Sequence, residues 1–446
     1  MQGVAEPGRQ LVKQSSWSRP RTVFGDRLVF TGFILLLVLV VFGPLMSNNN
    51  QLNGEGNPYR QAGYLVAALL VLAGLRPWAR FRSVLTIPTP MALTLLICLV
   101  SLTWSLAPGI GLRRLALTAV VMWVICSAID RLSYRQMLSV IRIALALTLI
   151  ANYLTVFAAP DIGIHSIGDR VEEGLIGDWR GLVAHKNFAG AICAITVLFF
   201  LFDARGVPRL VRFPVIAGAL VFLLMSQSKT SVGMLFGGVA VGYLFSFADF
   251  RYRIFSVLIA TVGTVGLMAY LSIYRYAFAQ LITDPETFTG RLVIWVHLGA
   301  YIKDHFWLGT GYGSFWNIGP DSPIYHYAND WVTDLTAGHN GYLDLAAQVG
   351  VPLAVVIVVL MLLWPFVRLL AAPRSAGQTG ALLVGLMLFG IGHNMTETSL
   401  LERDTMMQVA IVIAVALTWK VVGPAATGGR LLPIDPIATD GTRRRR

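Results

Sequence analysis

The chain has 446 residues, of which 56% are hydrophobic and only 13% are charged, and its mean hydropathy is +0.67. Soluble globular proteins carry about 25% charged residues, so this composition excludes a water-soluble enzyme. Apolar runs of about 20 residues recur along the whole chain, which is typical of a polytopic membrane protein. The net charge of +12 does not indicate nucleic-acid binding, because the position of each charge matters more than the sum in a membrane protein.

The sequence predicts an all-α membrane protein with about twelve transmembrane helices. A polar, basic tail (1–27) precedes helices one to nine (28–273), and helices ten to twelve (348–422) precede a second tail (423–446). The predicted spans lie near 28–46, 62–75, 87–106, 111–129, 137–159, 184–202, 211–226, 231–248, 254–273, 348–370, 377–394 and 405–422. Gly233 and Gly237 have a spacing that lets two helices approach closely.

The distribution of charge predicts that both tails are cytoplasmic. With that orientation 23 of the 35 Lys and Arg residues lie on the cytoplasmic side and 11 on the other, with Arg142 inside a span. Cytoplasmic loops carry the excess of Lys and Arg in membrane proteins. Because Arg142 lies close to the cytoplasmic end of its span, we expect it to extend to the lipid headgroups.

Two of the predicted outer segments are more than simple connections, the loop 160–183 and the segment 274–347. The second is too long for an ordinary loop, and 15 of the 69 residues from Tyr274 to Tyr342 are aromatic, which is not typical of a disordered linker. Residues 291–305 are predicted to form an amphipathic helix, whose apolar positions are Leu292, Trp295, Leu298 and Ile302. We therefore expect a catalytic segment here.

Cations and histidines gather at the predicted outer ends of the spans. They are Arg180, His185, Lys186, Lys229, Arg291 and His339. Arg binds phosphate oxygens as a bidentate fork, and Lys binds them as a point charge. Aromatic rings pack against the apolar faces of sugars, and histidine can accept the proton of a hydroxyl. This combination favours sugar transfer from a lipid phosphate.

The same segments resemble the bacterial O-antigen ligase and polysaccharide polymerase superfamily, most of all its exopolysaccharide polymerase branch. The similarity is carried in order by Arg180-Gly…His185-Lys-Asn187, Ser226-Gln-Ser-Lys-Thr230, Gly290-Arg…Trp295, Leu308-Gly-Thr-Gly-Tyr-Gly313 and His339-Asn-Gly-Tyr-Leu…Gly350. The resemblance implies a glycosyltransferase-C-like membrane fold and an inverting glycosyl transfer that needs neither metal nor cofactor. It also implies a glycan on undecaprenyl pyrophosphate as the donor.

The resemblance also implies roles for individual residues. Two arginines and one histidine dominate the ligase pattern; the second arginine matches Arg291 and the histidine matches His339. Lys229 occupies the position of the first arginine, a departure that favours a polymerase over a ligase. We expect Arg291 and Lys229 to contact the pyrophosphate, with Arg180 or Lys186 in support, and His185 to be a further substrate-binding residue. His339 is expected to accept or orient the proton of an acceptor hydroxyl, although an imidazolium could equally bind phosphate.

Other polar residues have open interpretations. Arg113 and Arg114, at an outer span end, either contact phosphate or extend to headgroups. Glu397 is a candidate second acid–base group, but the sequence favours a solvated surface position for it. Acidic residues such as Asp178 could hold Arg180, His185 and Lys186 in salt bridges. The remaining histidines (His165, His297, His305, His326 and His393) are interpreted as surface or satisfied polar residues, and 308–313 is not a P-loop.

The sequence leaves three functions to be distinguished. The first is polymerisation of lipid-linked oligosaccharide units at the periplasmic face of the bacterial inner membrane, with a flippase and a chain-length regulator as partners besides the bilayer. The second is an O-antigen ligase that transfers the glycan to lipid A core. The third is a secondary transporter with twelve spans, which predicts internal repeats and buried mid-span charges that the sequence does not show.

Overall fold

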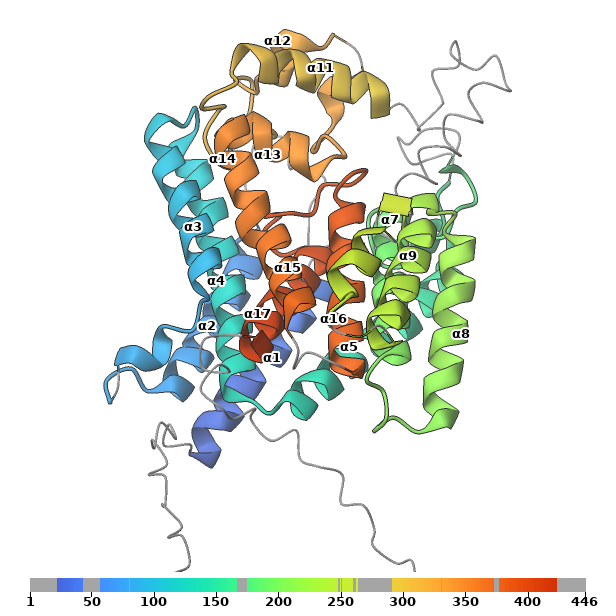
Figure 1. Cartoon of the computed structure of the whole chain (residues 1–446). Coiled ribbons are helices and arrows are strands. Elements are labelled where there is room, and N and C mark those ends of the chain that lie inside the picture. The colour runs from blue at the N-terminus through green and yellow to red at the C-terminus, as the bar shows by residue number, and fades with distance from the viewer. Residues whose placement is uncertain are drawn as a thin grey trace, which may run out of the picture.

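The computed structural model describes residues 22–422, except 43–56, 80, 167–174, 248, 250, 260, 261, 264–290, 330 and 373–376. In this part of the chain the secondary structure is helical, with one isolated antiparallel bridge between Ile164 and Trp179. The helices form an upright bundle with a smaller helical layer above it (Figure 1). The prediction of an all-α polytopic membrane protein is confirmed.

Six described helices are long and apolar enough to cross a membrane. They are α1 (Val23–Phe42), α2 (Pro58–Leu75), α4 (Pro108–Arg131), α5 (Tyr134–Ala158), α9 (Lys229–Phe247) and the continuous helix formed by α14 (Val351–Val358), the π-helical η8 (Val359–Leu363) and α15 (Trp364–Ala371). Shorter apolar helices are α3 (Thr89–Ser101) with η4 (Leu102–Trp104), α7 (Lys186–Leu201), α16 (Gln378–His393) and α17 (Met406–Val422). A further helix, α8 (Arg209–Met225), packs beside α7.

Eleven of the twelve predicted spans therefore coincide with described helices. Of the ninth, residues 254–259, 262 and 263 are helical, and the rest lies outside the described residues. Almost all of the N-terminal tail, the C-terminal tail and residues 274–290 also lie outside them. The number of spans stays a prediction.

Helix ends that the charge pattern assigns to one side of the membrane do meet in the structure. Arg131 at the end of α4 pairs with Asp26 at the start of α1, at 2.6 Å. Lys420 in the last turn of α17 donates to the carbonyl of Ile129. The start of α1 and the end of α17 thus lie at the same end of the bundle, and α13 (Gly341–Val349) lies at the other end.

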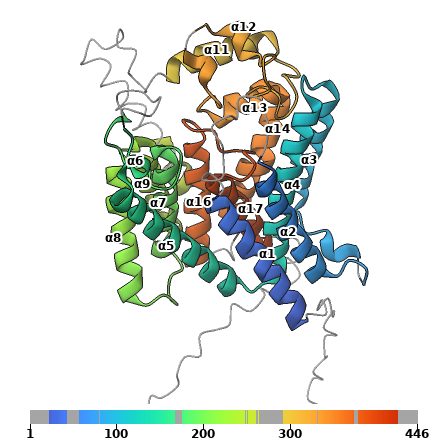
Figure 2. The same cartoon turned by 180° about the vertical axis from the view of Figure 1, so that it is seen from behind.

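The layer above the bundle has a small core of its own. It is built from α11 (Arg291–Asp304), α12 (Ile324–Tyr327), η7 (Trp331–Asp334) and α13 (Figure 2). Ile294, Leu298 and Tyr301 of α11 are buried in this core, together with Phe315 and Trp316. The predicted helix 291–305 is confirmed, but its buried face is shifted: Leu292 is 44% exposed.

The glycine-rich stretch 308–313 fastens this layer to the bundle. Gly309 and Gly311 have positive φ angles of 61° and 86°. A Cβ atom at Gly309 would lie 2.4 Å from the carbonyl oxygen of Ala347, and one at Gly311 would lie 2.6 Å from Cα of Ser105. The glycines therefore serve close backbone packing between the α3–α4 connection and α13, and not phosphate binding.

Close helix packing occurs beside the predicted glycine pair. Helices α9 and α16 approach at Gly238 and Gly242, where added Cβ atoms would lie 3.1 Å from the carbonyl oxygens of Gly385 and Ala381 respectively. These two glycines have the same four-residue spacing, on the same helix, as the predicted pair Gly233 and Gly237. Small residues let helix backbones approach because no side chain separates them.

The position of Arg142 contradicts the expectation that its side chain extends to the lipid headgroups. The side chain is only 7% exposed and does not extend to headgroups. Its guanidinium donates to the carbonyl oxygens of Phe199, Phe202 and Asp203 at 2.8, 3.3 and 2.7 Å. These carbonyls lie at the end of α7, where backbone acceptors have no partner within the helix, so Arg142 caps α7 from α5.

The glycine contact predicts a stability difference between two single substitutions. We expect Gly242→Ala to destabilise the bundle by about 1–3 kcal/mol, because its Cβ would lie 2.6 Å from the ring of Phe202. Gly299 is in α11 with no neighbour within 4 Å of an added Cβ, so Gly299→Ala should be neutral or stabilising by up to about 1 kcal/mol. Thermal unfolding of the purified proteins in detergent measures both. Equal melting temperatures would contradict the proposed contact.

Candidate functional site

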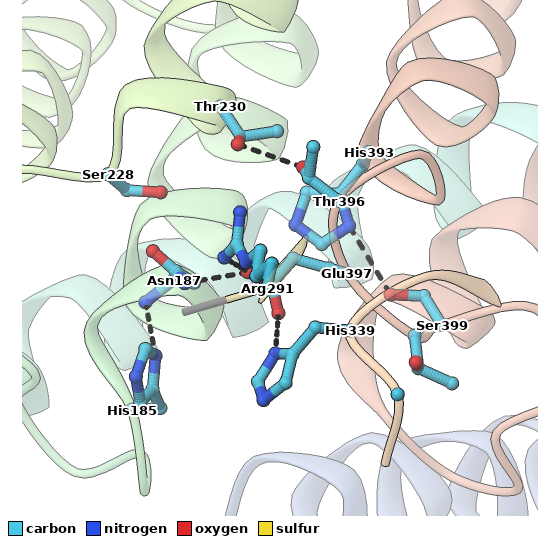
Figure 3. A network of polar contacts seen from close by, with 12 residues as sticks. His185, Asn187, Ser228, Thr230, Arg291, His339, His393, Thr396, Glu397 and Ser399 are labelled. Atoms are coloured by element: carbon cyan, nitrogen blue, oxygen red, sulfur yellow. Dashed lines mark hydrogen bonds and ion pairs between the residues drawn. The ribbon is translucent and has the colours of Figure 1, made fainter. Parts of the chain in front are cut away.

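A buried carboxylate organises the polar residues at the upper end of the bundle. Glu397 lies in the loop between α16 and α17 (residues 394–405) and is 1% exposed. Arg291 of α11 pairs with its Oε1, which also accepts a hydrogen bond from Nδ2 of Asn187 at 2.6 Å. Nδ1 of His339 lies 3.2 Å from Oε2. Figure 3 shows the three side chains, from three separate parts of the chain, converging on Glu397.

This position overturns the expectation of a solvated surface residue. Burial alone raises the pKa of Glu397, but the hydrogen bond from His339 and the charge of Arg291 outweigh it and lower the pKa to about 2. Glu397 is therefore a carboxylate at neutral pH. Since a carboxylate only accepts hydrogen bonds, Nδ1 of His339 is the donor and its Nε2 is left as an acceptor.

His339 is held in an unusual backbone conformation. Its φ angle is +49°, in the left-handed region, which costs about 1–3 kcal/mol for such a residue unless the surroundings fix it. Asn340 follows as the N-cap of α13, and its Oδ1 accepts from the amides of Tyr342 and Leu343. The backbone N–H of Gly341 donates to the carbonyl of Asn394 at 2.9 Å. The His339-Asn-Gly sequence is thus a tight turn locked against the α16–α17 loop.

A second buried acid, Asp344, supports this turn and was not singled out by the sequence analysis. It is 1% exposed and accepts hydrogen bonds from Nε1 of Trp316 at 2.7 Å and from the amide of Gly338 at 2.9 Å. The hydroxyl of Thr398, next to Glu397, also donates to it. Burial raises the pKa of Asp344 to about 6 against these donors. Its place in the first turn after an Asn N-cap was the sequence signal that could have identified it.

Arg291 is placed by the layer above the bundle. It is the first described residue of α11, and its side chain is 12% exposed. Nε1 of Trp295, one turn later, donates to the carbonyl of Gly338 at 3.1 Å, which fixes α11 to the His339 turn. Within the described residues, Arg291 donates only one of its N–H groups, to Glu397. Its other N–H groups are therefore available to a ligand.

Lys229 lies beside this cluster but makes no contact with it. It is exposed at the start of α9, and no ion pair holds it within the described part of the chain. The hydroxyl of the next residue, Thr230, is bonded to that of Thr396 at 2.9 Å. Ser228 and Ser231 pack against Gly190 of α7, which brings the starts of α7 and α9 together.

The cations of the first predicted loop are engaged by the protein itself. Lys186 is buried and its Nζ pairs with Asp178 at 2.5 Å, as the salt-bridge alternative predicted. Nε of Arg180 donates to the carbonyl of Ile162 at 2.7 Å. His185 is the N-cap of α7, and its Nδ1 accepts from the amide of Asn187 at 3.2 Å. Of the three, only His185 lies against His339, with 6.4 Å between ring centroids.

Arg113 and Arg114 lie apart from the cluster. Arg114 donates to the carbonyls of Gly313, Trp316 and Asn317 at 2.6 to 3.0 Å, so it clamps the loop after the glycine-rich stretch. Neither predicted role, phosphate contact or extension to headgroups, describes these contacts. Arg113 is half-buried on the same turn of α4. The sequence could not distinguish a ligand phosphate from backbone carbonyls, because arginine donates to both.

For two other histidines the structure excludes a surface position and leaves the interpretation as buried polar residues with partners. His165 and His393 are both buried, at 2% and 0% exposed, so neither is a surface residue. Nε2 of His165 accepts from the amide of Lys186 at 3.3 Å, and Nδ1 of His393 lies 3.3 Å from the hydroxyl of Ser399. Within the described residues, no three His, Cys, Asp or Glu side chains are grouped so that they could hold a metal ion.

Part of the chain matches a known protein family. Residues 213–358 match the family model described as O-Antigen ligase, about one third of the chain. This match supports a relation to the O-antigen ligase and polysaccharide polymerase superfamily. The match includes Lys229, Arg291 and His339, whereas Asn187 and Glu397 lie outside it. No curated protein matches the chain. Together with the six apolar helices, this match supports a multi-pass membrane protein and an activity of the glycosyl-transfer type.

The depressed pKa of Glu397 predicts how stability depends on pH. Because its pKa is lowered from 4.5 to about 2, the ionised group stabilises the fold above pH 4.5, and this contribution is lost as the pH falls towards 2. We expect Glu397→Gln to cost roughly 3–5 kcal/mol at pH 7, since Arg291 then keeps an uncompensated charge. The difference from the parent protein should shrink between pH 4.5 and pH 3. Chemical unfolding in detergent at several pH values measures it, and a constant difference would contradict an ionised Glu397.

Proposed function

We propose that the protein polymerises oligosaccharide units carried on undecaprenyl pyrophosphate, at the periplasmic face of the bacterial inner membrane. The observation that carries this proposal is the Glu397-centred cluster, which combines an oriented histidine with cations at one end of a bundle of apolar helices. The reaction is an inverting glycosyl transfer without a metal. The family match over residues 213–358 supports glycosyl transfer in general, and the site supports the particular roles below.

His339 is the proposed general base. Its Nδ1–H is bound to the Glu397 carboxylate, so Nε2 can accept the proton of an acceptor hydroxyl. The negative charge of Glu397 then stabilises the imidazolium that forms, as a carboxylate does for the histidine of a catalytic triad. The side chain of His339 is 29% exposed, which leaves its free edge accessible to a sugar.

The leaving group needs positive charge, because the bond between C1 and the pyrophosphate oxygen breaks with its electron pair on phosphate. Arg291 offers its unused donors, and Lys229 offers a charge that no described residue neutralises. Three helices also begin here: α7, α9 and α13 start at Lys186, Lys229 and Gly341. Helix N-termini carry partial positive charge and favour bound phosphate.

Lys229 also favours polymerase over ligase within this proposal, as it replaces the arginine of the ligase pattern. The charge distribution of the loops favours cytoplasmic tails, which puts the cluster in the periplasm. A flippase would then supply the lipid-linked donor across the membrane, and a chain-length regulator would act on the growing polymer. The lipid part of the donor stays in the bilayer beside the spans.

The first test compares glycans in cells with the parent protein and with His339→Ala. We expect loss of long polymer and accumulation of single lipid-linked units, because losing a general base reduces rate by about 10²–10⁴-fold. The measurement is a size profile of surface and lipid-linked glycans, with protein level verified. His326→Ala is the matched control, since His326 is exposed on α12 and should leave the profile unchanged.

Other outcomes of this test overturn the proposal in different ways. Full-length glycan stranded on undecaprenyl pyrophosphate, with bare lipid A core, would establish a ligase. An unchanged glycan size profile in the His339→Ala strain would show that His339 is not essential and would favour the transporter function.

A second test addresses the unpaired cation. We expect Lys229→Met to raise the KM for the lipid-linked donor about 10- to 100-fold, from the roughly 1.5–3 kcal/mol of one charged hydrogen bond. Lys229→Arg keeps the charge and should stay near the parent value. Because Lys229 is exposed and makes no described contact, neither substitution should change the melting temperature. Equal KM values for all three proteins would exclude contact between Lys229 and the donor.

A further inference from the structure

Two histidines from distant parts of the chain face the same small region. His185 precedes α7 and His339 precedes α13, and their ring centroids are 6.4 Å apart at an interplanar angle of 52°. Figure 3 shows both rings on the same side of Asn187 and Glu397. Neither Nε2 atom has a hydrogen-bond partner within the described residues.

The hydrogen bonds set the two rings in opposite tautomers. In His339, Nδ1 donates to a carboxylate, so Nε2 is an acceptor. In His185, Nδ1 accepts from the backbone amide of Asn187, which can only donate. A neutral His185 therefore carries its proton on Nε2 and presents a donor. Burial lowers the pKa of His185 to about 3, so the ring stays neutral at physiological pH.

Asn187 connects the two rings. Its backbone amide fixes the tautomer of His185, and its side chain donates at 2.6 Å to Glu397, which fixes the tautomer of His339. Asn187 is 7% exposed, and both interactions are made from the first turn of α7. Behind His185 lies His165, with 5.4 Å between ring centroids. The His185 ring is therefore held from two sides, while its Nε2 edge has no protein partner.

We propose that His185 is a second catalytic residue, a neutral hydrogen-bond donor to the departing pyrophosphate, opposite the base His339. This inference rests on the proposed function. The acceptor hydroxyl loses its proton to Nε2 of His339 while its oxygen bonds to C1 of the donor sugar. The C1–O bond to phosphate breaks, and its electron pair stays on the pyrophosphate oxygen. The Nε2–H of His185 donates to that oxygen without transferring its proton, and His339 later releases its proton to water.

A neutral donor suits this position because the site already holds charged groups. Arg291 and Lys229 provide charge for the pyrophosphate, while a second imidazolium beside His339 would oppose protonation of the base. A fixed donor aimed at developing negative charge stabilises the transition state, and its removal typically costs about 10²–10³-fold in rate. His185 and His339 thus differ in environment as an acid–base pair does.

The test separates this role from helix capping, which His185 also performs. His185→Asn keeps a cap oxygen and adds an N–H donor, whereas His185→Ser keeps the cap with a hydroxyl too short to reach the ligand. The probe is farnesyl pyrophosphate, titrated calorimetrically into the purified full-length proteins in nanodiscs. Turnover with the lipid-linked donor is measured in parallel, and melting temperatures check the fold.

We expect His185→Asn to bind the probe within about threefold of the parent protein and His185→Ser about tenfold more weakly, with turnover reduced about 10²-fold in the serine variant only. Equal binding and turnover in the two variants, both stable, would show that His185 only caps α7 and would overturn the inference. If the parent protein itself does not bind farnesyl pyrophosphate, the proposed function fails instead, because its donor is a polyprenyl pyrophosphate.

Discussion

The charge of Glu397 is the constraint on which the upper end of this structure depends. A buried carboxylate without partners costs several kcal/mol, and here it has partners from α7, α11 and the turn before α13. Satisfying one acid therefore fixes the relative position of segments up to 210 residues apart in sequence. The same interactions that remove the energetic penalty also orient the imidazole of His339 and the guanidinium of Arg291.

The strained backbone of His339 and the charged side chains around it lie where the proposed reaction requires them. The left-handed φ angle of His339 is supported by an N-cap, by the packing of Gly341 on the α16–α17 loop, and by the buried Asp344 below the turn. Each support comes from a residue that contacts no ligand in the proposed reaction. Because the turn is held from several sides, His339 can be exposed on its Nε2 edge without losing its orientation.

The Arg and Lys side chains divide into two groups, according to whether they donate to backbone carbonyl oxygens. Arg142, Arg180 and Arg114 donate to backbone carbonyls, so they hold helix ends and loops. Lys229 and part of Arg291 have no such partner within the described residues, so they can bind an anion. In both groups a guanidinium or ammonium group is suited to donate hydrogen bonds to oxygen atoms. Only the three-dimensional structure shows whether those oxygens belong to the protein.

The sequence by itself determined the elements that depend on local composition. Apolar length predicted the spans, and helical spacing predicted the helix 291–304. Charge placement assigned the start of α1 and the ends of α4 and α17 to one side of the membrane, and in the structure Asp26 of α1 pairs with Arg131 of α4. The sequence also made His339, Arg291 and Lys229 candidate site residues, and all three lie within the segment that matches the family model.

Only the tertiary structure decided which of these residues act together. Glu397 was expected at the surface, since a short polar loop between two spans has no local signal for burial. Asn187 carried no signal for its contact with Glu397, and the helix position of Asp344 did not show that its side chain contacts Trp316 and Thr398. Their roles arise from partners far away in sequence. The energetic need to satisfy a buried charge is a property of the packed molecule, and no periodicity or composition records it.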